Sequence, residues 1–362
     1  MKREVLVFPY WNINPYLNLL YLDAQSQGID IVRLDKYEDL VASLTKSRPG
    51  QIFHIHSTEL VVQKAMDAAE ALSRVDELIR LFAVAKAKGA KLVWSVHNVL
   101  PHESRFYDIE IRLIDAIAAN AERIHVLAES TAEQTAGHFR FDDEKVTVVQ
   151  HSSFWGVYDQ TMPTAEAKAS FGLTENDNAV LFLGQMRAYK GLHLLIAATK
   201  ELNLEGANLK LLLAGSAKPK HRREIQKLIG DDPTIQARFS FIENDDLQRW
   251  FKAADVAVLP FQQILNSGSL YLAASFGVPV IAPALGNLPA LFNAEPWPTL
   301  YDPNDPKQQI KEALLARFNP HTRTADQEKV RAAEAFAANY RPWQMSQDFT
   351  LKVLEPLFST GA

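Results

Sequence analysis

The stretch from 261 to 282 constrains the fold most, because it predicts a helix between two short apolar strands. The flanking runs 256–259 and 278–282 have the length and the β-branched content of buried parallel strands. Small polar residues at 266–269 stand where the helix should begin, and Gly268 would let a ligand approach the backbone. This pattern is typical of an anion site at the carboxyl edge of a parallel sheet, and we place a diphosphate there. An ordinary capped turn is the alternative.

Strands alternate with helical segments along the whole chain. The chain has 362 residues, which favours two domains. Strands are expected at 5–8, 29–34, 52–56, 91–96, 123–127 and 146–149, then at 179–183, 211–215, 239–242, 256–259 and 278–282. Helices are expected at 17–27, at 60–88 and at 328–358, the last broken at Pro342. The pattern predicts an α/β protein of two Rossmann-like doubly wound domains, at 1–158 and 159–340.

Composition narrows the classes of function. A net charge of −5 argues against a nucleic-acid binder that works through overall charge. The chain has no cysteine, which fits a reducing cytoplasm and excludes disulfides and thiolate metal sites. No apolar run has the length of a membrane span, and the start of the chain resembles a strand more than a signal peptide. We therefore expect a cytoplasmic protein.

A second motif follows the strand expected at 179–183. Gly184 and Gly191 bracket Arg187 and Lys190 at a strand-to-helix turn. Arginine can bind a phosphate through two hydrogen bonds, and lysine adds a point charge beside it. A solvated loop with incidental charge is the alternative, but charge, glycine and topology agree on a phosphate site.

Polar and aromatic side chains gather where the strands of the first domain end. His97, His102 and Glu103 follow the fourth strand and are candidates for acid–base chemistry or for orienting a sugar hydroxyl. No third ligand accompanies the two histidines, so we expect no metal. His151 could also face a ligand cleft, and the loop with Trp11 and Asn12 could line a carbohydrate pocket, with ordinary packing as the alternative. His54 and His56 are interpreted as structural, since a lone histidine on a strand usually is.

Three motifs together resemble the retaining GT-B glycosyltransferases of family 4. They are the turn 184–191, the strand 253–260 (AADVAVLP) and the strand 276–282 (FGVPVIA), and they cover the second domain in the family's order. In the first domain, the segment 96–98 (VHN) resembles the one that carries the family's active-site histidine. The break at Pro342 resembles the family's C-terminal helix, which crosses back, so residues 341–362 are expected to return to the first domain across a cleft.

The resemblance implies a nucleotide-sugar donor in the second domain and an acceptor in the first, where the acceptor-side residues would be Trp11, Asn12, His102 and His151. Arg187 and Lys190 would neutralise the donor diphosphate together with Gly184, and Ser267, Gly268 and Ser269 would add hydrogen-bond donors. On this basis we expect a metal-independent hexosyltransferase that needs no cofactor. It would move a sugar from a UDP- or GDP-sugar to a hydroxyl of a glycan, lipid-linked or small-molecule acceptor in polysaccharide or glycoconjugate synthesis. We expect no nucleic-acid partner, and the basic run 218–223 allows a peripheral contact with the inner face of a membrane.

Two other hypotheses stay open at this point. The family's paired glutamates fall at Ile264 and Leu272, and the arginine after its first glycine is Gln185 here. These departures motivate a non-catalytic protein that binds a nucleotide or sugar at a degenerate GT-B site. A GT-B epimerase or phosphorylase is the third hypothesis, although no motif for a pyridoxal-phosphate lysine is present. Transfer or hydrolysis of a donor by the purified protein separates the first two.

Overall fold

The chain folds into two compact units, each built on a six-stranded parallel sheet. The computed structural model describes residues 2–11, 15–101, 104–319 and 323–359. Unit 1 comprises Met1–His151 and Pro342–Ala362, and unit 2 comprises Ser152–Arg341. The boundary expected after residue 158 therefore lies within unit 2. The predicted class, two Rossmann-like domains with a C-terminal segment that returns to the first, describes the observed architecture.

The sheet of unit 1 has the strand order β2-β1-β3-β4-β5-β6, and all of its strands are parallel. Its strands are β1 (Glu4–Phe8), β2 (Asp30–Arg33), β3 (Gln51–Ile55), β4 (Lys91–Val96), β5 (Arg123–Val126) and β6 (Val146–Val148). Its α-helices are α1 (Tyr16–Leu20), α2 (Leu22–Ser26), α3 (Tyr37–Thr45), α4 (Glu59–Val62), α5 (Ala68–Ala87), α6 (Tyr107–Asn120), α7 (Thr131–Thr135), α16 (Pro342–Phe349) and α17 (Glu355–Ser359), with a π-helical turn, η5 (Thr350–Leu354), between the last two.

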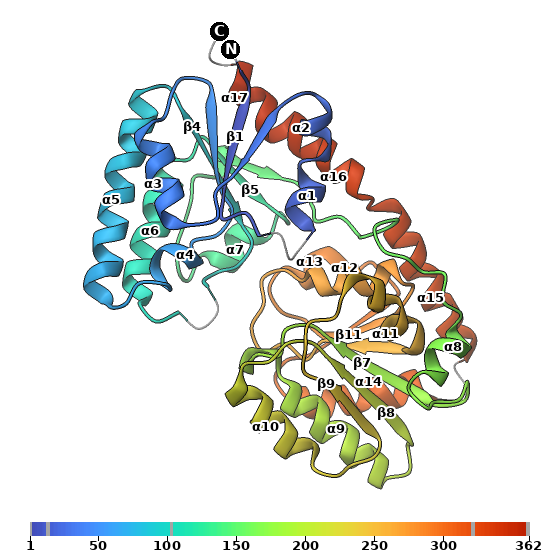
Figure 1. Ribbon diagram of the computed structural model, residues 1–362. Helices are drawn as coiled ribbons and strands as arrows, with labels where there is room; N and C mark the ends of the chain where they lie inside the picture. The colour runs from blue at the N-terminus through green and yellow to red at the C-terminus, as the bar shows by residue number, and fades with distance from the viewer. Residues whose placement is uncertain (1, 12–14, 102–103, 320–322, 360–362) are drawn as a thin grey trace. The chain divides into compact units, whose positions relative to one another are not determined.

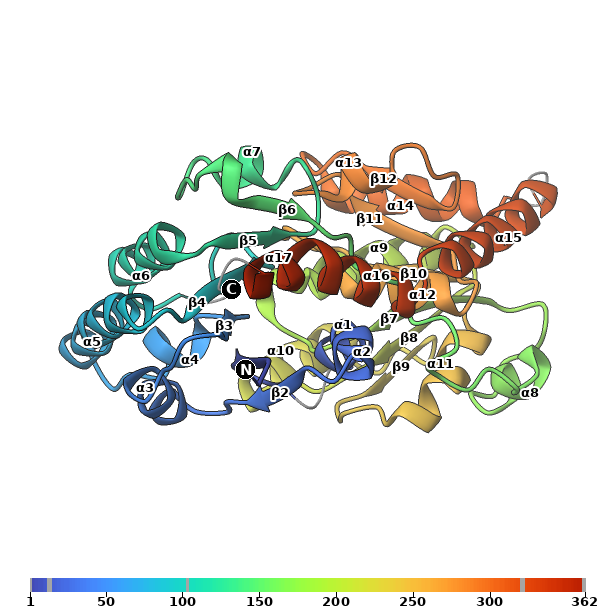
Figure 2. The same ribbon diagram turned by 90° about the horizontal axis from the view of Figure 1, so that it is seen from above.

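Helices cover both faces of this sheet. Figure 1 shows α3, α5 and α6 on one side and α1, α2, α16 and α17 on the other. Seen from above, α16 and α17 run beside α1 and α2 (Figure 2), and α16 contacts both α1 and α2. The hydroxyl of Ser346 accepts a hydrogen bond from the backbone N–H of Asp23 at 2.7 Å and donates one to the carbonyl of Leu20 at 2.9 Å. The C-terminal segment is therefore part of the core of unit 1.

The sheet of unit 2 has the order β12-β11-β10-β7-β8-β9 and is also parallel throughout. Its strands are β7 (Asn178–Leu183), β8 (Leu209–Ala214), β9 (Ile235–Arg238), β10 (Val256–Val258), β11 (Val280–Pro283) and β12 (Pro298–Tyr301). Its α-helices are α8 (Thr164–Ala169), α9 (Leu192–Leu204), α10 (Pro219–Ile229), α11 (Leu247–Ala253), α12 (Gly268–Ser275), α13 (Leu288–Phe292), α14 (Pro306–Arg317) and α15 (Arg323–Asn339). Within the described ranges, no helix is both long and apolar enough to cross a membrane.

Several expected elements differ from the observed ones. The strand expected at 239–242 is wrong, because the chain pairs with β8 through Ile235–Arg238 instead. The helix expected at 60–88 is divided into α4 and α5. Asp67 causes this division, because its carboxylate accepts a hydrogen bond from the N–H of Glu70 and starts a new helix. The helix expected at 17–27 is likewise divided at Tyr21, and Gly28 follows it with a φ of 77°.

Candidate functional site

Four histidines and a tyrosine meet at the carboxyl edge of the sheet in unit 1. His56 and His97 come directly after β3 and β4, His125 lies in β5, and His151 follows β6. Parallel strands end at the same edge, so residues far apart in the sequence converge there. Tyr16, the first residue of α1, has its ring centroid 5.2 Å from that of His97 and 4.7 Å from that of His151. The predicted residues His97 and His151 therefore lie in one cluster.

His56 completes this cluster, although the sequence suggested a structural role for it. Its ring centroid lies 4.2 Å from that of His97 and 5.8 Å from that of Tyr16. Trp11, which is 37% exposed, packs edge-on against it with the centroids 5.9 Å apart. His56 is nine-tenths buried, and its Nδ1 atom has no hydrogen-bond partner in the part of the chain that the structure describes. An imidazole of this kind is suited to a ligand with hydroxyl groups.

Burial keeps His56, His97 and His125 of this cluster uncharged at neutral pH. Burial lowers the pKa of His97 and of His56 well below 6.5, and the neighbouring histidines lower each further. The sequence analysis predicted His97 for acid–base chemistry, which needs a pKa near the working pH. A histidine with a strongly lowered pKa acts instead as a neutral hydrogen-bonding group. Three other predicted residues, Asn12, His102 and Glu103, lie outside the described residues.

In unit 2, the turn 184–191 joins the end of β7 to α9 and is held against the segment that follows β10. The N–H of Gln262 donates to the carbonyl of Tyr189 at 2.8 Å. Gly191 has a φ of 66°, and a Cβ atom there would lie 1.9 Å from the carbonyl oxygen of Pro260. Only glycine permits this backbone conformation and this close approach together. The predicted turn is therefore in contact with the chain that leads to α12.

Both cations of this turn lack an acidic partner among the described residues. Lys190 places its Nζ atom 4.0 Å from the ring centroid of Phe261 and 5.3 Å from that of Tyr189. Burial and the nearby charge of Arg187 lower the pKa of Lys190 to about 8. A cation that is held by aromatic rings, without a carboxylate, is available to an anionic ligand.

The predicted helix start lies at the same edge of this sheet. α12 begins at Gly268, with Ser267 as its N-cap and Ser269 in its first turn. The Ser267 side chain is 5% exposed, makes no capping hydrogen bond, and its Oγ atom has no partner among the residues that the structure describes. Backbone N–H groups and a free hydroxyl at a helix N-terminus suit a phosphate group.

Some residues of this edge were not predicted from the sequence. A Cβ atom at Gly215, after β8, would lie 1.9 Å from the carbonyl oxygen of Gly184, so the two loops meet backbone to backbone. A glycine directly after an apolar strand is a signal that could have identified Gly215. Phe261 and Tyr16 had no comparable signal, because an aromatic residue in a loop is most often part of ordinary packing.

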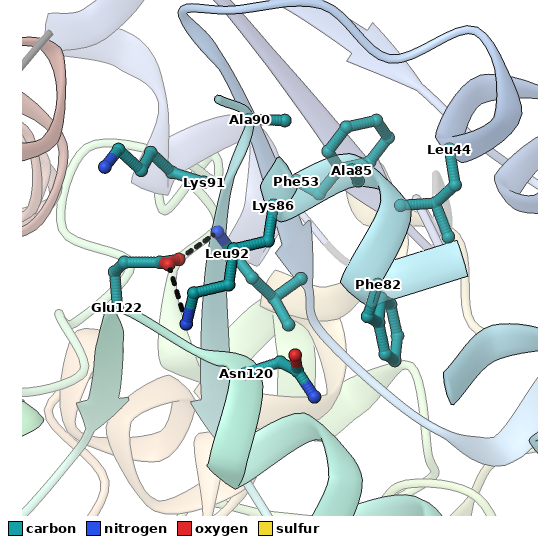
Figure 3. Close-up of a pocket in the computed structure, with 10 residues that line it drawn as sticks. All are labelled: Leu44, Phe53, Phe82, Ala85, Lys86, Ala90, Lys91, Leu92, Asn120 and Glu122. Atoms are coloured by element: carbon teal, nitrogen blue, oxygen red, sulfur yellow. Dashed lines mark hydrogen bonds and ion pairs between the residues drawn. The ribbon is translucent and has the colours of Figure 1, made fainter. Parts of the chain in front are cut away.

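A small hollow at the opposite edge of the unit 1 sheet is not a ligand site. Figure 3 shows Glu122 bound to Lys86 and to the backbone of Leu92 beside this hollow, at the start of β4. The cavity has a volume of about 10 Å³. That is room for about one water molecule. Among the described side chains, no group of three histidine or acidic residues is arranged to hold a metal ion.

Two parallel Rossmann-like units with a returning C-terminal segment define the GT-B fold, and solved structures share it. The chain is similar to sucrose-phosphate synthase from Thermosynechococcus elongatus, with a TM-score of 0.74, 16% identity, and 99% of this chain and 100% of that one covered. It is also similar to Anabaena HepE, solved in complex with UDP and glucose, with a TM-score of 0.73, 13% identity, and 98% and 99% of the chains covered.

Sequence comparison identifies the family. Residues 177–318 match the model of the glycosyl transferases group 1. A GDP-mannose:glycolipid 4-beta-D-mannosyltransferase of Xanthomonas campestris pv. campestris is 26% identical over 282 residues, which are 76% of this chain and 71% of that protein. A D-inositol 3-phosphate glycosyltransferase of Streptomyces bingchenggensis is 26% identical over 254 residues, which are 67% of this chain and 54% of that protein. The resemblance predicted from the three motifs is confirmed: residues 177–318 are a domain of the glycosyl transferases group 1.

Proposed function

We propose that this enzyme transfers a sugar, without a bound metal, from a UDP- or GDP-sugar held by unit 2 to a hydroxyl group of an acceptor held by unit 1. The observation that carries the proposal is the pair Arg187 and Lys190, which has no described carboxylate partner and lies at the carboxyl edge of the sheet. Ser267 supports it, because its buried hydroxyl has no described partner at the start of α12.

The metal-free mechanism follows from the charge of the leaving group. Sugar transfer breaks the bond between the anomeric carbon and the donor diphosphate, so negative charge develops on the diphosphate. Two cations and a helix N-terminus can stabilise that charge as a metal ion would. No cofactor is part of the proposal.

The relatives guide the choice of donor and acceptor to test. One is named for GDP-mannose and a glycolipid, and HepE was solved with UDP. We therefore propose a UDP- or GDP-hexose as donor and a glycan or lipid-linked acceptor in polysaccharide or glycoconjugate synthesis.

A calorimetric panel of UDP, GDP and their sugars tests the donor site. We expect one nucleotide to bind with the same affinity in buffer and in excess EDTA, and transfer to continue in EDTA. Binding or transfer that EDTA abolishes and magnesium restores would contradict the metal-free mechanism. Lack of binding by every member of the panel would contradict the proposed function itself.

We propose His97 as the catalytic residue that contacts the donor sugar, with Glu103 as the candidate acid–base group. His97→Ala should lower kcat by about 100- to 1000-fold with little change in nucleotide affinity, because it removes orientation and charge stabilisation. His97→Asn should retain more activity, since a neutral hydrogen-bonding group remains. The exposed His138, changed to alanine, is the control. If His97→Ala turns over normally, the catalytic assignment passes to Glu103, with Glu103→Gln as its test.

A lipid-linked acceptor would bring the enzyme to a membrane surface. α10 buries Ile225 and Ile229 and exposes Lys220, Arg222 and Arg223. Basic side chains on one exposed face attract anionic headgroups by about 1 kcal/mol each. Co-sedimentation with vesicles that contain phosphatidylglycerol, compared with pure phosphatidylcholine, measures this peripheral contact.

A further inference from the structure

A hydrogen-bonded chain of buried side chains runs beneath the histidine cluster of unit 1. The Tyr21 hydroxyl bonds Nδ1 of His54, and Nε2 of His54 lies 2.7 Å from the Oγ atom of Ser95. Ser95 Oγ lies 2.7 Å from Nδ1 of His125, and Nε2 of His125 lies 3.0 Å from the carbonyl oxygen of Val149. The four side chains are between 0% and 2% exposed. The chain therefore crosses β3, β4 and β5 without contact with water.

Burial keeps both rings neutral, and the last acceptor then fixes the direction of every bond in this hydrogen-bonded chain. A carbonyl oxygen can only accept, so Nε2 of His125 carries the proton and Nδ1 accepts from the Ser95 hydroxyl. Ser95, having donated its proton, accepts from Nε2–H of His54. Nδ1 of His54 then accepts from Tyr21. When both rings are neutral, this is the one arrangement of protons that satisfies all four bonds.

The chain does not conduct protons, because both of its ends are closed. Tyr21 is fully buried, and burial raises its pKa well above 10. Phe349 of α16 packs against the rings of Tyr21, His54 and His125, with centroid distances of 5.6, 5.6 and 5.1 Å. A closed chain of this kind orients its rings rather than moving charge.

The hydrogen-bonded chain contacts the histidine cluster through two pairs of rings. The His54 centroid lies 6.0 Å from that of His56, and the His125 centroid lies 6.2 Å from that of His97. We propose that Tyr21, His54, Ser95 and His125 are positioning residues for sugar transfer. Their chain locks both buried imidazoles as Nε2–H and gives His56 and His97 a neutral, rigid support. This proposal rests on the proposed function.

The hydrogen-bonded chain disfavours a positive charge on His125, the ring next to His97. An added proton would have to enter His125 at Nδ1, which would reverse the bonds from His125 to Tyr21 and leave the buried Tyr21 hydroxyl proton without its acceptor. The titratable groups that face His97 are Tyr16 on α1, His56 after β3, His125 in β5 and His151 after β6. Burial holds the pKa of His125 at about 4, which agrees with a neutral ring. His97 thus meets the substrate as an uncharged group over the whole physiological range of pH.

Nuclear magnetic resonance of histidine labelled with ¹⁵N tests the tautomers in the ligand-free protein. We expect two imidazoles in the Nε2–H form that take up no proton between about pH 5.5 and about pH 8. Tyr21→Phe removes only the hydroxyl group that donates to His54. It should raise the pH at which one histidine titrates by about one pH unit, the value of one hydrogen bond to the neutral ring. Tyr37→Phe is the matched control, because that hydroxyl bonds Glu77 and none of the described histidines.

Kinetics of the same variants tests the positioning role. We expect Tyr21→Phe and Ser95→Ala to lower kcat with unchanged donor affinity, Ser95→Thr to recover most of the loss, and Tyr37→Phe to match the wild type. An Nδ1–H tautomer at His54 or His125 would overturn the proposal, as would a Tyr21→Phe variant that titrates and turns over like Tyr37→Phe. If both rings show the Nε2–H tautomer but the protein transfers no sugar, the positioning role and the proposed function are both wrong, whereas the hydrogen-bonded chain itself is confirmed.

Discussion

At the scale of single residues, Lys190 should make the proposed donor site sensitive to pH. Its pKa of about 8 means that it is charged at neutral pH and loses its charge as the pH rises. We expect wild-type nucleotide affinity to fall between about pH 7 and about pH 9.5, as the pH passes through the pKa of the free protein; the fall extends above that pKa because bound phosphate favours the charged form. Lys190→Arg should bind equally over this range, since a guanidinium keeps its proton.

The variant Lys190→Ala measures how much the Lys190 side chain contributes to nucleotide affinity. It should weaken nucleotide binding by about 10- to 100-fold at neutral pH while the protein stays folded. Titration calorimetry at several pH values measures all three proteins. Equal wild-type affinity at the two ends of the range would show that Lys190 does not bind the diphosphate.

Gly191 provides a test of the turn itself. Gly191 and Gly172 have nearly the same φ, 66° and 68°, but a Cβ atom at Gly172 meets nothing within 4 Å. Gly172→Ala therefore measures the backbone cost alone, about 1–2 kcal/mol of unfolding free energy. Gly191→Ala should cost clearly more and should weaken nucleotide binding, because its Cβ atom would displace the chain at Pro260. Urea unfolding and calorimetry measure both, and equal losses in the two variants would contradict the tight contact.

The sequence indicated the individual residues of the two sites unevenly. Gly184, Arg187 and Lys190 were identifiable because glycine and charge follow an apolar strand. The hydrogen-bonded chain was not, because His54, Ser95 and His125 are unremarkable in separate strands and become neighbours only through the strand order. Their neutrality depends on burial, which no local pattern reports.

At the scale of elements, central strands were predicted better than edge strands. β4 and β7 are buried between neighbours and show continuous apolar runs. β9 and β12 lie at the two edges of the unit 2 sheet. An edge strand has one partner and needs fewer apolar residues, and β12 begins with Pro298, which edges tolerate. The sequence analysis therefore placed this strand at the more apolar residues 239–242, and it did not predict β12.

The role proposed for the start of α12 can be tested by substituting Gly268. Gly268→Val places a branched side chain at the first residue of the helix, where the diphosphate is proposed to bind. We expect nucleotide binding to fail while circular dichroism stays near that of the wild type. Gly137→Val is the control, since a Cβ atom at Gly137 has open space around it. If Gly268→Val still binds nucleotide, this turn serves only to cap the helix.

At the scale of the whole molecule, the C-terminal segment should stabilise unit 1 alone. Phe349 is fully buried in the core that Tyr21 and Val5 share, whereas Trp343, on the same helix, is 46% exposed. Phe349→Ala should cost about 3–5 kcal/mol of unfolding free energy, and Trp343→Ala within about 0.5 kcal/mol. Unfolding followed with and without bound nucleotide identifies the transition of unit 2, which should not move. A shift of that transition in Phe349→Ala would contradict the assignment of α16 to unit 1.

The division of unit 1 into two pieces of chain also sets an order of events during translation. Domains generally fold as units while the ribosome is still adding residues. Here the whole of Ser152–Arg341 leaves the ribosome before Pro342–Ala362 does, so unit 2 can be complete while unit 1 still lacks α16. Until α16 packs onto unit 1, no Phe349 ring contacts Tyr21, His54 and His125. The nascent chain should therefore complete its proposed donor site before the support of its histidine cluster, so that unit 2 could bind a nucleotide before unit 1 is finished.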